Sequence, residues 1–129
     1  MNYKDKLDRI FSQYIRLRDA DQNGYIRCIS CGKIVFWKEA DNGHFINRKH
    51  MSLRFSETNC NAQCRSCNRF DEGNMTGYNL RMIKKYGQQT VDLLIISKNK
   101  ANKISNIEYK ILIKHYQQEV KRLLKEKNL

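Results

Sequence analysis

Two closely spaced pairs of cysteines stand out in this sequence. Residues 59–68 read NCNAQCRSCN and residues 28–31 read CISC, so the pairs are Cys28/Cys31 and Cys64/Cys67. Each Cys-x-x-Cys pair presents two sulfur atoms to one ion, and two such pairs supply the four thiolates of a tetrahedral zinc site. We therefore expect these four cysteines to bind one structural Zn²⁺, which would fix the segment between the pairs in place.

The chain carries a large excess of positive charge. Lysine and arginine number 25 against 13 aspartate and glutamate, a formal net charge of +12 over 129 residues. Such an excess favours a polyanionic partner, nucleic acid first, although the lysines could also simply keep helix surfaces solvated. The length predicts one domain over 1–129, with an N-terminal helix (3–18), a zinc-stapled core (about 25–86) and a helical basic extension (88–129).

The sequence has no feature of a membrane or secreted protein. No apolar run approaches the ~20 residues that span a bilayer, and the start of the chain lacks the apolar segment of a signal peptide. We therefore expect a cytoplasmic protein with no membrane partner. Five cysteines in a reducing compartment favour metal ligation over disulfides. Cys60 lies outside both pairs and is expected to be a small buried side chain.

Hydrophobic periodicity predicts a mostly helical chain around one small β element. Apolar residues at helical spacing indicate a helix over 3–18, and a capping box at 105–108 opens a long amphipathic helix. The expected apolar stripe of that helix consists of Ile107, Ile111, Leu112, Tyr116, Val120, Leu123 and Leu124. Other helices are expected near 64–70, 74–86 and 90–96.

Short β-prone runs lie near the first cysteine pair. Residues 25–27, 34–37 and 44–46 are rich in aromatic and β-branched side chains. The segment 41–43, Asp-Asn-Gly, is typical of a tight turn. We therefore expect small strands in a zinc-bound hairpin, with His44 at the start of one strand.

His44 is the candidate catalytic base. Hydrolysis of a phosphodiester needs a group that deprotonates water and a cation that stabilises the leaving oxygen. The imidazole of His44 and the amide oxygen of Asn68 suit these two roles, and Asn59 could orient the histidine or its loop. Taken singly, such residues are more often structural or turn-forming. Oxygen ligands suit Mg²⁺ or Mn²⁺, so a catalytic metal is expected beside the structural zinc.

In this order and combination the residues resemble a known class of nuclease. Cys28-x-x-Cys31, Gly43-His44-Phe45, Asn59 and Cys64-x-x-Cys67-Asn68 look like an HNH nuclease of the His-Me finger superfamily with asparagine at the last position. The closer resemblance is to the phage NinG (Rap) recombination endonuclease family, through GHFINR at 43–48, LRF at 53–55, NCNAQCRSCN at 59–68 and EGN at 72–74. The similarity covers about residues 14–86.

The resemblance implies an α+β fold with a ββα-metal, HNH-like core that cuts branched DNA, such as D-loops and Holliday junctions, in the cytoplasm of a bacterial host. It makes His44 the general base, Asn59 the residue that steadies its loop, and Asn68 a metal ligand. Many HNH enzymes have an acidic metal ligand directly before the histidine, where this chain has Gly43. The candidate ligands of the catalytic metal are Asp41, Asn68, Asp71, Glu72 and Asn74.

Basic residues near the predicted site and on the C-terminal helix are candidates for phosphate contacts. The fork-shaped guanidinium of arginine suits phosphate, and Arg48 and Arg54 are expected nearest the scissile phosphate. Residues 98–129 hold nine lysines and arginines against three glutamates, so that helix could contact DNA, pair with a second copy or present a solvated face. The DNA-binding candidates are Arg48, Lys49, His50, Arg54, Arg65, Arg69, Lys114, Lys121 and Lys125.

Two other functions are left open by the sequence. A zinc-ribbon module that binds DNA or RNA without cutting it would result if Gly43 leaves the metal site inactive. A protein-interaction module would use the zinc only as a scaffold and the C-terminal helix for assembly. A homodimer is expected if the task is symmetric cleavage of a junction, because two nicks need two active sites.

Overall fold

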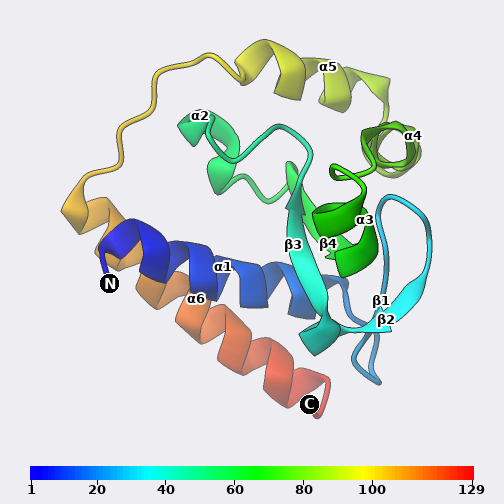
Figure 1. The fold of residues 1–129 in the computed structure, drawn as a ribbon. Helices are drawn as coiled ribbons and strands as arrows, with labels where there is room; N and C mark the ends of the chain where they lie inside the picture. Colours follow the sequence, from blue (N-terminus) through cyan, green and yellow to red (C-terminus); the bar gives the residue numbers. More distant parts are fainter.

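The computed structural model describes residues 1–129 as an α+β fold with two separate two-stranded sheets (Figure 1). The elements are α1 (Tyr3–Asp19), β1 (Tyr25–Arg27), β2 (Ile34–Phe36), the 3₁₀ helix η1 (Trp37–Glu39), β3 (Ala40–His44), α2 (Met51–Arg54), β4 (Cys60–Cys64), α3 (Arg65–Phe70), α4 (Met75–Tyr86), α5 (Gln88–Ser97) and α6 (Asn106–Glu126). Figure 1 shows α1 and α6 side by side, with α2, α4 and α5 on the other side of the β3–β4 ribbon.

The helices α1 and α6 form the larger hydrophobic core. The predicted capping box is present at the start of α6, where Ser105 and Glu108 exchange hydrogen bonds with each other's backbone. In the core between the two helices, the rings of Phe11 and Tyr116 meet edge to face with centroids 4.9 Å apart. Aromatic pairs in this geometry add stability beyond the area that they bury. This core also covers one face of the β3–β4 ribbon through Cys60 and Ala62.

Part of the predicted apolar stripe of α6 is wrong. Ile107 and Ile111 are 71% and 62% exposed, whereas Tyr109, Tyr116 and Leu123 are buried. The buried residues follow the 3.6-residue period of the helix around Tyr116, and both isoleucines fall on the opposite side of that period. The remaining residues of the expected stripe are buried or half-buried.

The β3–β4 ribbon occupies the centre of the fold. The strands are antiparallel, with Ala40 opposite Cys64 and His44 opposite Cys60. The predicted turn at 41–43 is wrong, since these residues lie within β3, and His44 ends its strand rather than starting it. Pairing with β4 overrides the turn propensity of Asp-Asn-Gly, because strand propensity depends strongly on tertiary context.

The remaining predicted elements agree with the structure at most positions. The hairpin β1–β2 pairs Ile26 with Val35 and brings together the two ends of the loop that carries Cys28 and Cys31. Helix α4 ends at Gly87, as predicted, and Gly87 has the positive φ (89°) that favours glycine. A second, smaller core joins α2, α4 and α5 through Ile29, Leu53, Tyr78, Met82, Val91 and Leu94. No helix here combines the length and apolar character needed to cross a bilayer.

Candidate metal centre and active site

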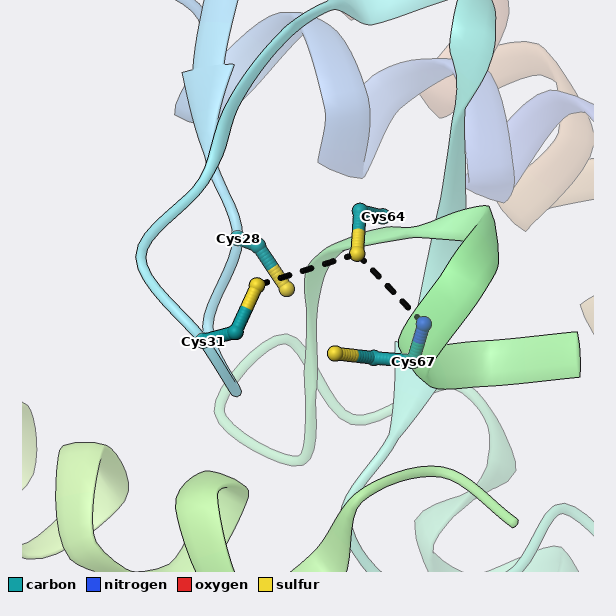
Figure 2. Close-up of side chains that lie close together, drawn as sticks. All are labelled: Cys28, Cys31, Cys64 and Cys67. Carbon is teal, nitrogen blue, oxygen red and sulfur yellow. Dashed lines mark hydrogen bonds between the residues drawn. The ribbon is translucent and has the colours of Figure 1, made fainter. Parts of the chain in front are cut away.

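The four paired cysteines converge at one point of the fold. The sulfur atoms of Cys28, Cys31, Cys64 and Cys67 all lie within 4.8 Å of one another (Figure 2). The closest recorded approach is 3.9 Å, between Cys31 Sγ and Cys64 Sγ. A tetrahedral zinc ion with Zn–S bonds of about 2.3 Å places its sulfur atoms about 3.8 Å apart. The cluster therefore fits the predicted structural zinc ion.

Polar hydrogens surround the sulfur atoms of this cluster. The backbone N–H groups of Ser30 and Cys67 donate to Cys28 Sγ and Cys64 Sγ, each at 3.4 Å. Asn74 Nδ2 donates to Cys67 Sγ at 3.4 Å, while its Oδ1 caps the start of α4. Hydrogen bonds of this kind stabilise ligating thiolates and hold them in position. Asn74, a candidate ligand of the catalytic metal, therefore lies beside the zinc site.

Cys60 is separate from the cluster. It is fully buried, and its Sγ lies 3.5 Å from the carbonyl oxygen of Arg54. Burial raises the pKa of the Cys60 thiol to about 12. Its sulfur is not among the four that lie within 4.8 Å of one another, so Cys60 is not placed to bind the same ion. The prediction of a small buried side chain at this position is confirmed.

A polar pocket lies along the free edge of β3, between α1 and α3. Its volume is about 250 Å³ and none of its lining residues is hydrophobic. We call it the catalytic pocket, after the predicted catalytic residues His44 and Asn68 in its lining, which also includes Asp8, Asp41, Asn42, Arg48 and Arg69. The structure thus brings together the predicted base, the predicted asparagine ligand and one of the candidate carboxylates.

The ring of His44 has a defined orientation in this pocket. Its Nε2 atom lies 3.0 Å from the carbonyl oxygen of Arg54. Because a carbonyl oxygen only accepts, Nε2 carries the proton, and Nδ1 of the neutral ring keeps its lone pair. Burial lowers the pKa of His44 below its ordinary value of 6.5, although the bond to the carbonyl opposes the shift. The imidazole is therefore neutral at neutral pH and able to accept a proton.

Asn59 ties down the loop that follows His44. The residue is fully buried, and its Oδ1 accepts from the Ile46 N–H at 2.8 Å. Its Nδ2 donates to the carbonyl oxygens of Ile46 and Leu53, at 3.0 and 3.2 Å. These bonds join the loop to α2, whose last residue, Arg54, supplies the carbonyl that orients the imidazole. The position suits a residue that steadies the loop, and its importance for catalysis stays a prediction.

Asp41 and Asn68 are in contact within the same pocket. Asn68 Nδ2 donates to Asp41 Oδ2 at 2.9 Å, and the guanidinium of Arg69 donates to both carboxylate oxygens at 2.8 and 2.9 Å. Burial alone would raise the pKa of Asp41, but hydrogen bonds from Arg69 and Asn68 hold it below its ordinary value. Nearby, Oδ1 of Asn42 is buried without a hydrogen-bond partner. Carboxylate and amide oxygens are the ligand types that Mg²⁺ and Mn²⁺ prefer, and a catalytic cation at this place stays a prediction.

Asp71 and Glu72 lie outside the catalytic pocket. Both are exposed, in the turn that leads from α3 to α4. Glu72 has a left-handed backbone conformation, with φ 48°. Of the candidate carboxylates, Asp41 alone lines the pocket that holds His44 and Asn68.

The four arginines among the DNA-binding candidates are all paired with carboxylates. The ion pairs are Arg48–Asp8 (3.1 Å), Arg54–Asp8, Arg65–Asp41 (3.9 Å) and Arg69–Asp41 (2.8 Å). The side chain of Arg54 is only 9% exposed and is held by Asp8, whereas that of Arg48 is 59% exposed. Arg48 is therefore the more accessible of the two arginines expected at the scissile phosphate, and phosphate contact stays a prediction.

The other DNA-binding candidates lie in two places. Lys49 is exposed, and His50 is half-buried at the N-cap of α2, where its side chain makes no capping bond. Lys114, Lys121 and Lys125 are exposed on α6, on the side opposite its buried residues. Because that buried side packs on α1, the three lysines point away from the catalytic pocket.

Gly43 precedes the histidine because a larger residue does not fit. A Cβ atom at this position would collide with the side chain of Gln63 on β4. Gln63 is buried and donates to Ser30 Oγ at 2.8 Å and to the carbonyl oxygen of Gly73 at 2.6 Å. The hydroxyl of Tyr78 donates to the carbonyl of Gly43 at 2.8 Å. The acidic ligand found before the histidine in many HNH enzymes is thus excluded here by packing.

Gly43→Ala is expected to lower the free energy of unfolding by about 1–3 kcal/mol, as overpacking of a buried site does. The added methyl group would displace Gln63 from its hydrogen bonds. Urea unfolding followed by circular dichroism at a fixed zinc concentration measures the change. In a Gln63→Ser protein, Gly43→Ala should lower the free energy of unfolding by less, because the smaller serine side chain leaves room for the methyl group. Equal costs in the two backgrounds would contradict the steric explanation.

Sequence reasoning missed three residues that shape the site. Asp8 binds both Arg48 and Arg54, Tyr78 holds the backbone of β3 by a hydrogen bond, and Gln63 fills the space beside Gly43. A charged residue next to an apolar stripe is ordinary on a helix, so Asp8 gave no signal. Gln63 gave a weak signal of its burial, because it directly precedes Cys64 and a residue beside a buried zinc ligand is itself expected to be buried.

Comparison with known proteins identifies the family. The family model described as Bacteriophage Lambda NinG protein matches residues 1–126. The chain belongs to the NinG family. It is 34% identical over 111 residues to protein NinG of Escherichia phage lambda and 35% identical over 111 residues to protein NinG of Salmonella phage P22, covering 85% of this chain each time. The chain spans about half (52%) the length of these NinG relatives.

Membership of the NinG family confirms the narrower of the two resemblances found in the sequence. No solved structure gives a significant match to the chain.

Proposed function

We propose that this chain is a divalent-metal-dependent DNA endonuclease of the HNH, or His-Me finger, type. The observation that carries the proposal is the catalytic pocket, where His44 and Asp41 of β3 meet Asn68 of α3. An antiparallel strand pair followed by a short helix, with the base on the first strand and the asparagine on the helix, suits the ββα-metal core implied by the sequence resemblance.

His44 is the general base in this proposal. Its Nδ1 accepts a proton from the attacking water, while Nε2–H stays bonded to the carbonyl of Arg54. The carbonyl dipole stabilises the positive charge that the ring acquires, and it also fixes the plane of the ring. The ion pair between Arg54 and Asp8 keeps this carbonyl in position.

Asp41 and Asn68 would hold the catalytic Mg²⁺ or Mn²⁺. When bound, the cation supplies positive charge that stabilises the leaving oxygen of the phosphodiester. Asn68 directly follows Cys67, so the zinc ligand fixes its position within α3. Arg48, which is largely exposed at the edge of the pocket, is the residue we assign to bind a non-bridging phosphate oxygen.

The substrate in this proposal is branched duplex DNA, including D-loops and Holliday junctions, in the cytoplasm of a bacterial host. Two features support it: the resemblance of the sequence motifs to recombination endonucleases and the net charge of +12. Symmetric cleavage of a four-way junction would require a homodimer, because each nick needs its own active site.

A plasmid-nicking assay tests the proposed function. The zinc-loaded protein is expected to nick supercoiled plasmid with Mg²⁺ or Mn²⁺ and to stop when EDTA is added briefly enough to leave the zinc bound. A panel of linear, flapped, D-loop and four-way DNA then tests the preference for branches. Folded protein that binds these substrates but cuts none of them would contradict the proposal and favour a zinc-ribbon binding module.

Asn68→Ala is expected to lower the nicking rate, and added Mn²⁺ should recover part of the loss. The substitution removes an oxygen ligand, so the cation binds more weakly and a higher concentration fills the site again. Rates measured over a Mn²⁺ titration show the shift. The control is Asn102→Ala, at an exposed position outside the pocket. Its nicking rate should depend on the Mn²⁺ concentration as that of the wild type does. An Asn68→Ala titration identical to the control would remove Asn68 from the metal site.

A further inference from the structure

A second pocket lies along the outer edge of β4. Its volume is about 400 Å³, and it is formed by β4, the end of β1, the end of α1 and one face of α4. The catalytic pocket lies along the outer edge of β3, the other strand of the ribbon, and the two pockets share no lining residue. We call the second one the basic pocket, after Arg27, Arg81, Lys84 and Lys85 in its wall.

The positive charge of the basic pocket is largely unpaired. Asp19 is the one acidic residue in its lining, and its carboxylate is already bonded to Arg18 at 2.8 Å. Lys85 Nζ lies 3.9 Å from Asp19, whereas the other three cations of the pocket take part in no ion pair of the structure. The two arginines that line the catalytic pocket are both paired, Arg48 with Asp8 and Arg69 with Asp41. The unneutralised charge is therefore at the edge of β4.

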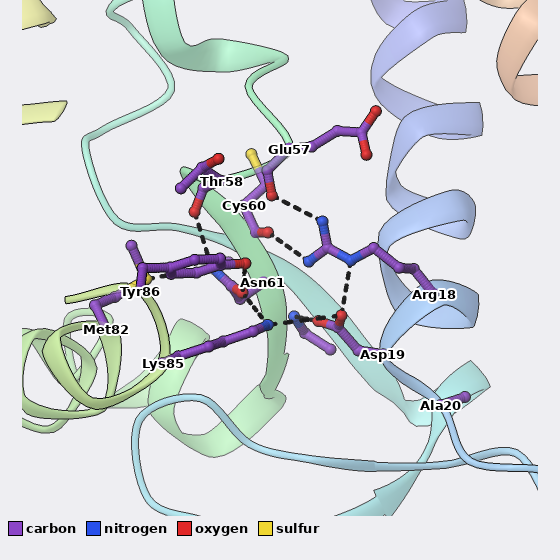
Figure 3. A network of polar contacts seen from close by, with 12 residues as sticks. Arg18, Asp19, Ala20, Glu57, Thr58, Cys60, Asn61, Met82, Lys85 and Tyr86 are labelled. Atoms are coloured by element: carbon purple, nitrogen blue, oxygen red, sulfur yellow. Dashed lines mark hydrogen bonds and ion pairs between the residues drawn. The ribbon is translucent and has the colours of Figure 1, made fainter. Parts of the chain in front are cut away.

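Lys85 is held in place by a buried amide (Figure 3). Asn61 is 1% exposed, and its Oδ1 accepts from Lys85 Nζ at 2.8 Å and from the Tyr86 hydroxyl at 3.2 Å. The Nδ2 of Asn61 donates to the carbonyl of Thr58 at 3.3 Å. A lysine fixed in this way loses little further side-chain freedom when it binds an anion, in contrast to a free surface lysine.

Both arginines of the basic pocket contact Gly32, which directly follows the first cysteine pair. Arg27 Nη1 donates to the carbonyl of Gly32 at 3.2 Å. The guanidinium of Arg81 lies against the same glycine, since a Cβ there would be 3.0 Å from Arg81 Cζ. Arg81, Lys84 and Lys85 lie at positions i, i+3 and i+4 of α4 and so share one face of that helix.

We propose that the basic pocket binds phosphate groups of a nucleic-acid backbone, on the edge of the ribbon opposite the catalytic pocket. The identity of this polyanion rests on the proposed function. A nucleic acid is favoured over an acidic polypeptide because the hydrophobic residues of the lining, Cys28, Ile29 and Ala62, are buried, so the side chains that a ligand meets are mainly those of the four cations. Arginine and lysine donors at several points suit repeated phosphates.

The two pockets bind different parts of the nucleic acid. Ser12 lines the catalytic pocket and Asp19 the basic pocket, and both are on α1. They are two helical turns apart, about 10 Å along the axis. One phosphate group cannot fill both pockets, so the basic pocket adds affinity for a backbone segment away from the cut.

Paired charge-neutralising variants test the basic pocket. The probe is a fluorescein-labelled DNA duplex, titrated by fluorescence anisotropy without Mg²⁺ or Mn²⁺, so that binding is measured apart from cleavage. Arg81→Gln/Lys84→Gln should bind the duplex roughly tenfold more weakly or worse, and the slope of log affinity against log salt should flatten by about 2. Lys100→Gln/Lys103→Gln removes the same charge at exposed positions of the segment before α6 and should change both quantities little.

Equal effects of the two variants would overturn the proposal, because net charge alone would then explain the binding. If Arg81→Gln disturbs the loop that carries Cys28 and Cys31, as zinc content and unfolding will report, Lys84→Gln is compared with Lys100→Gln instead, because both lysines are exposed. Loss of binding to polyglutamate with unchanged binding to DNA would assign the pocket to an acidic polypeptide and refute the proposal. Nicking activity is measured in a separate assay. A protein that binds DNA through the basic pocket but cuts no DNA would refute only the proposed nuclease function, whereas equal binding losses in the two variants would refute only the basic pocket.

Discussion

His44→Ala is expected to lower the plasmid-nicking rate by about 10²–10⁴-fold, the usual loss when a general base is removed. The fold, the zinc content and the affinity for DNA should stay close to wild type. His44 is at the end of β3, and its ring makes one recorded hydrogen bond, to the carbonyl of Arg54. Its removal therefore leaves the strand pairing and the zinc site intact.

The loss in His44→Ala should not respond to added Mn²⁺. No other histidine lines the catalytic pocket, and its carboxylates, Asp8 and Asp41, are engaged by arginines. A higher concentration of cation cannot supply the missing proton acceptor, whereas it can refill the site in Asn68→Ala. The two variants therefore separate the base from the metal ligand by their response to one titration.

His50→Ala is the matched control for His44→Ala. His50 is half-buried at the start of α2, and its side chain makes no capping hydrogen bond. Its variant should nick at close to the wild-type rate. A folded His44→Ala protein that also nicks at the wild-type rate would remove the nuclease assignment from this pocket and favour a binding module that does not cut.

The parts of the fold that the sequence predicted are those determined by local signals. A capping box marks the start of α6 whatever its surroundings, and Gly87 ends α4 through its own positive φ. The zinc cysteines were predictable for a similar reason, because each pair is a short motif that places two sulfurs together. These predictions required no knowledge of which segments pack together.

The parts that the sequence did not predict depend on distant contacts. β4 reads Cys-Asn-Ala-Gln-Cys and contains no β-branched or aromatic residue, so its composition does not mark it as a strand, although all five residues are buried. Residues 41–43 become part of a strand only by pairing with β4. The ion pair of Arg54 with Asp8 joins α2 to α1. Asp41 could not be selected from among the candidate carboxylates until the pairing of β3 had placed it beside Asn68.

The structural zinc site should give the largest effect on stability. Cys67→Ser, or Cys28→Ser, is expected to lose the zinc and most of the ordered structure at about residues 25–75. Structural zinc contributes about 10–16 kcal/mol to the folding of zinc-finger peptides, which is as large as the whole net stability of a typical domain. Here the ion would connect the β1–β2 hairpin to the β4–α3 junction.

The elements that carry the zinc ligands are short. The three buried cysteines, Cys28, Cys64 and Cys67, form a hydrophobic cluster of their own, joined by half-buried Val35. Helix α3 has six residues, β1 and β2 have three each, and elements of this length are not stable alone. The helices α1 and α6 have their own core. Far-ultraviolet circular dichroism should therefore show partial loss of signal, with helix retained from α1 and α6.

Cys60→Ser is the control that identifies the fourth thiolate. Its sulfur is buried next to Arg54 rather than in the cluster, so the variant should keep one zinc ion per chain while losing some stability from the buried hydroxyl, about 1–3 kcal/mol. Metal analysis after gel filtration measures the zinc, and urea unfolding measures the stability. Loss of zinc in Cys60→Ser would mean that the ligand set is wrong. Because the zinc fixes Asn68 through Cys67, a Cys67→Ser protein that is folded, zinc-free and fully active would separate the metal centre from the catalytic pocket altogether.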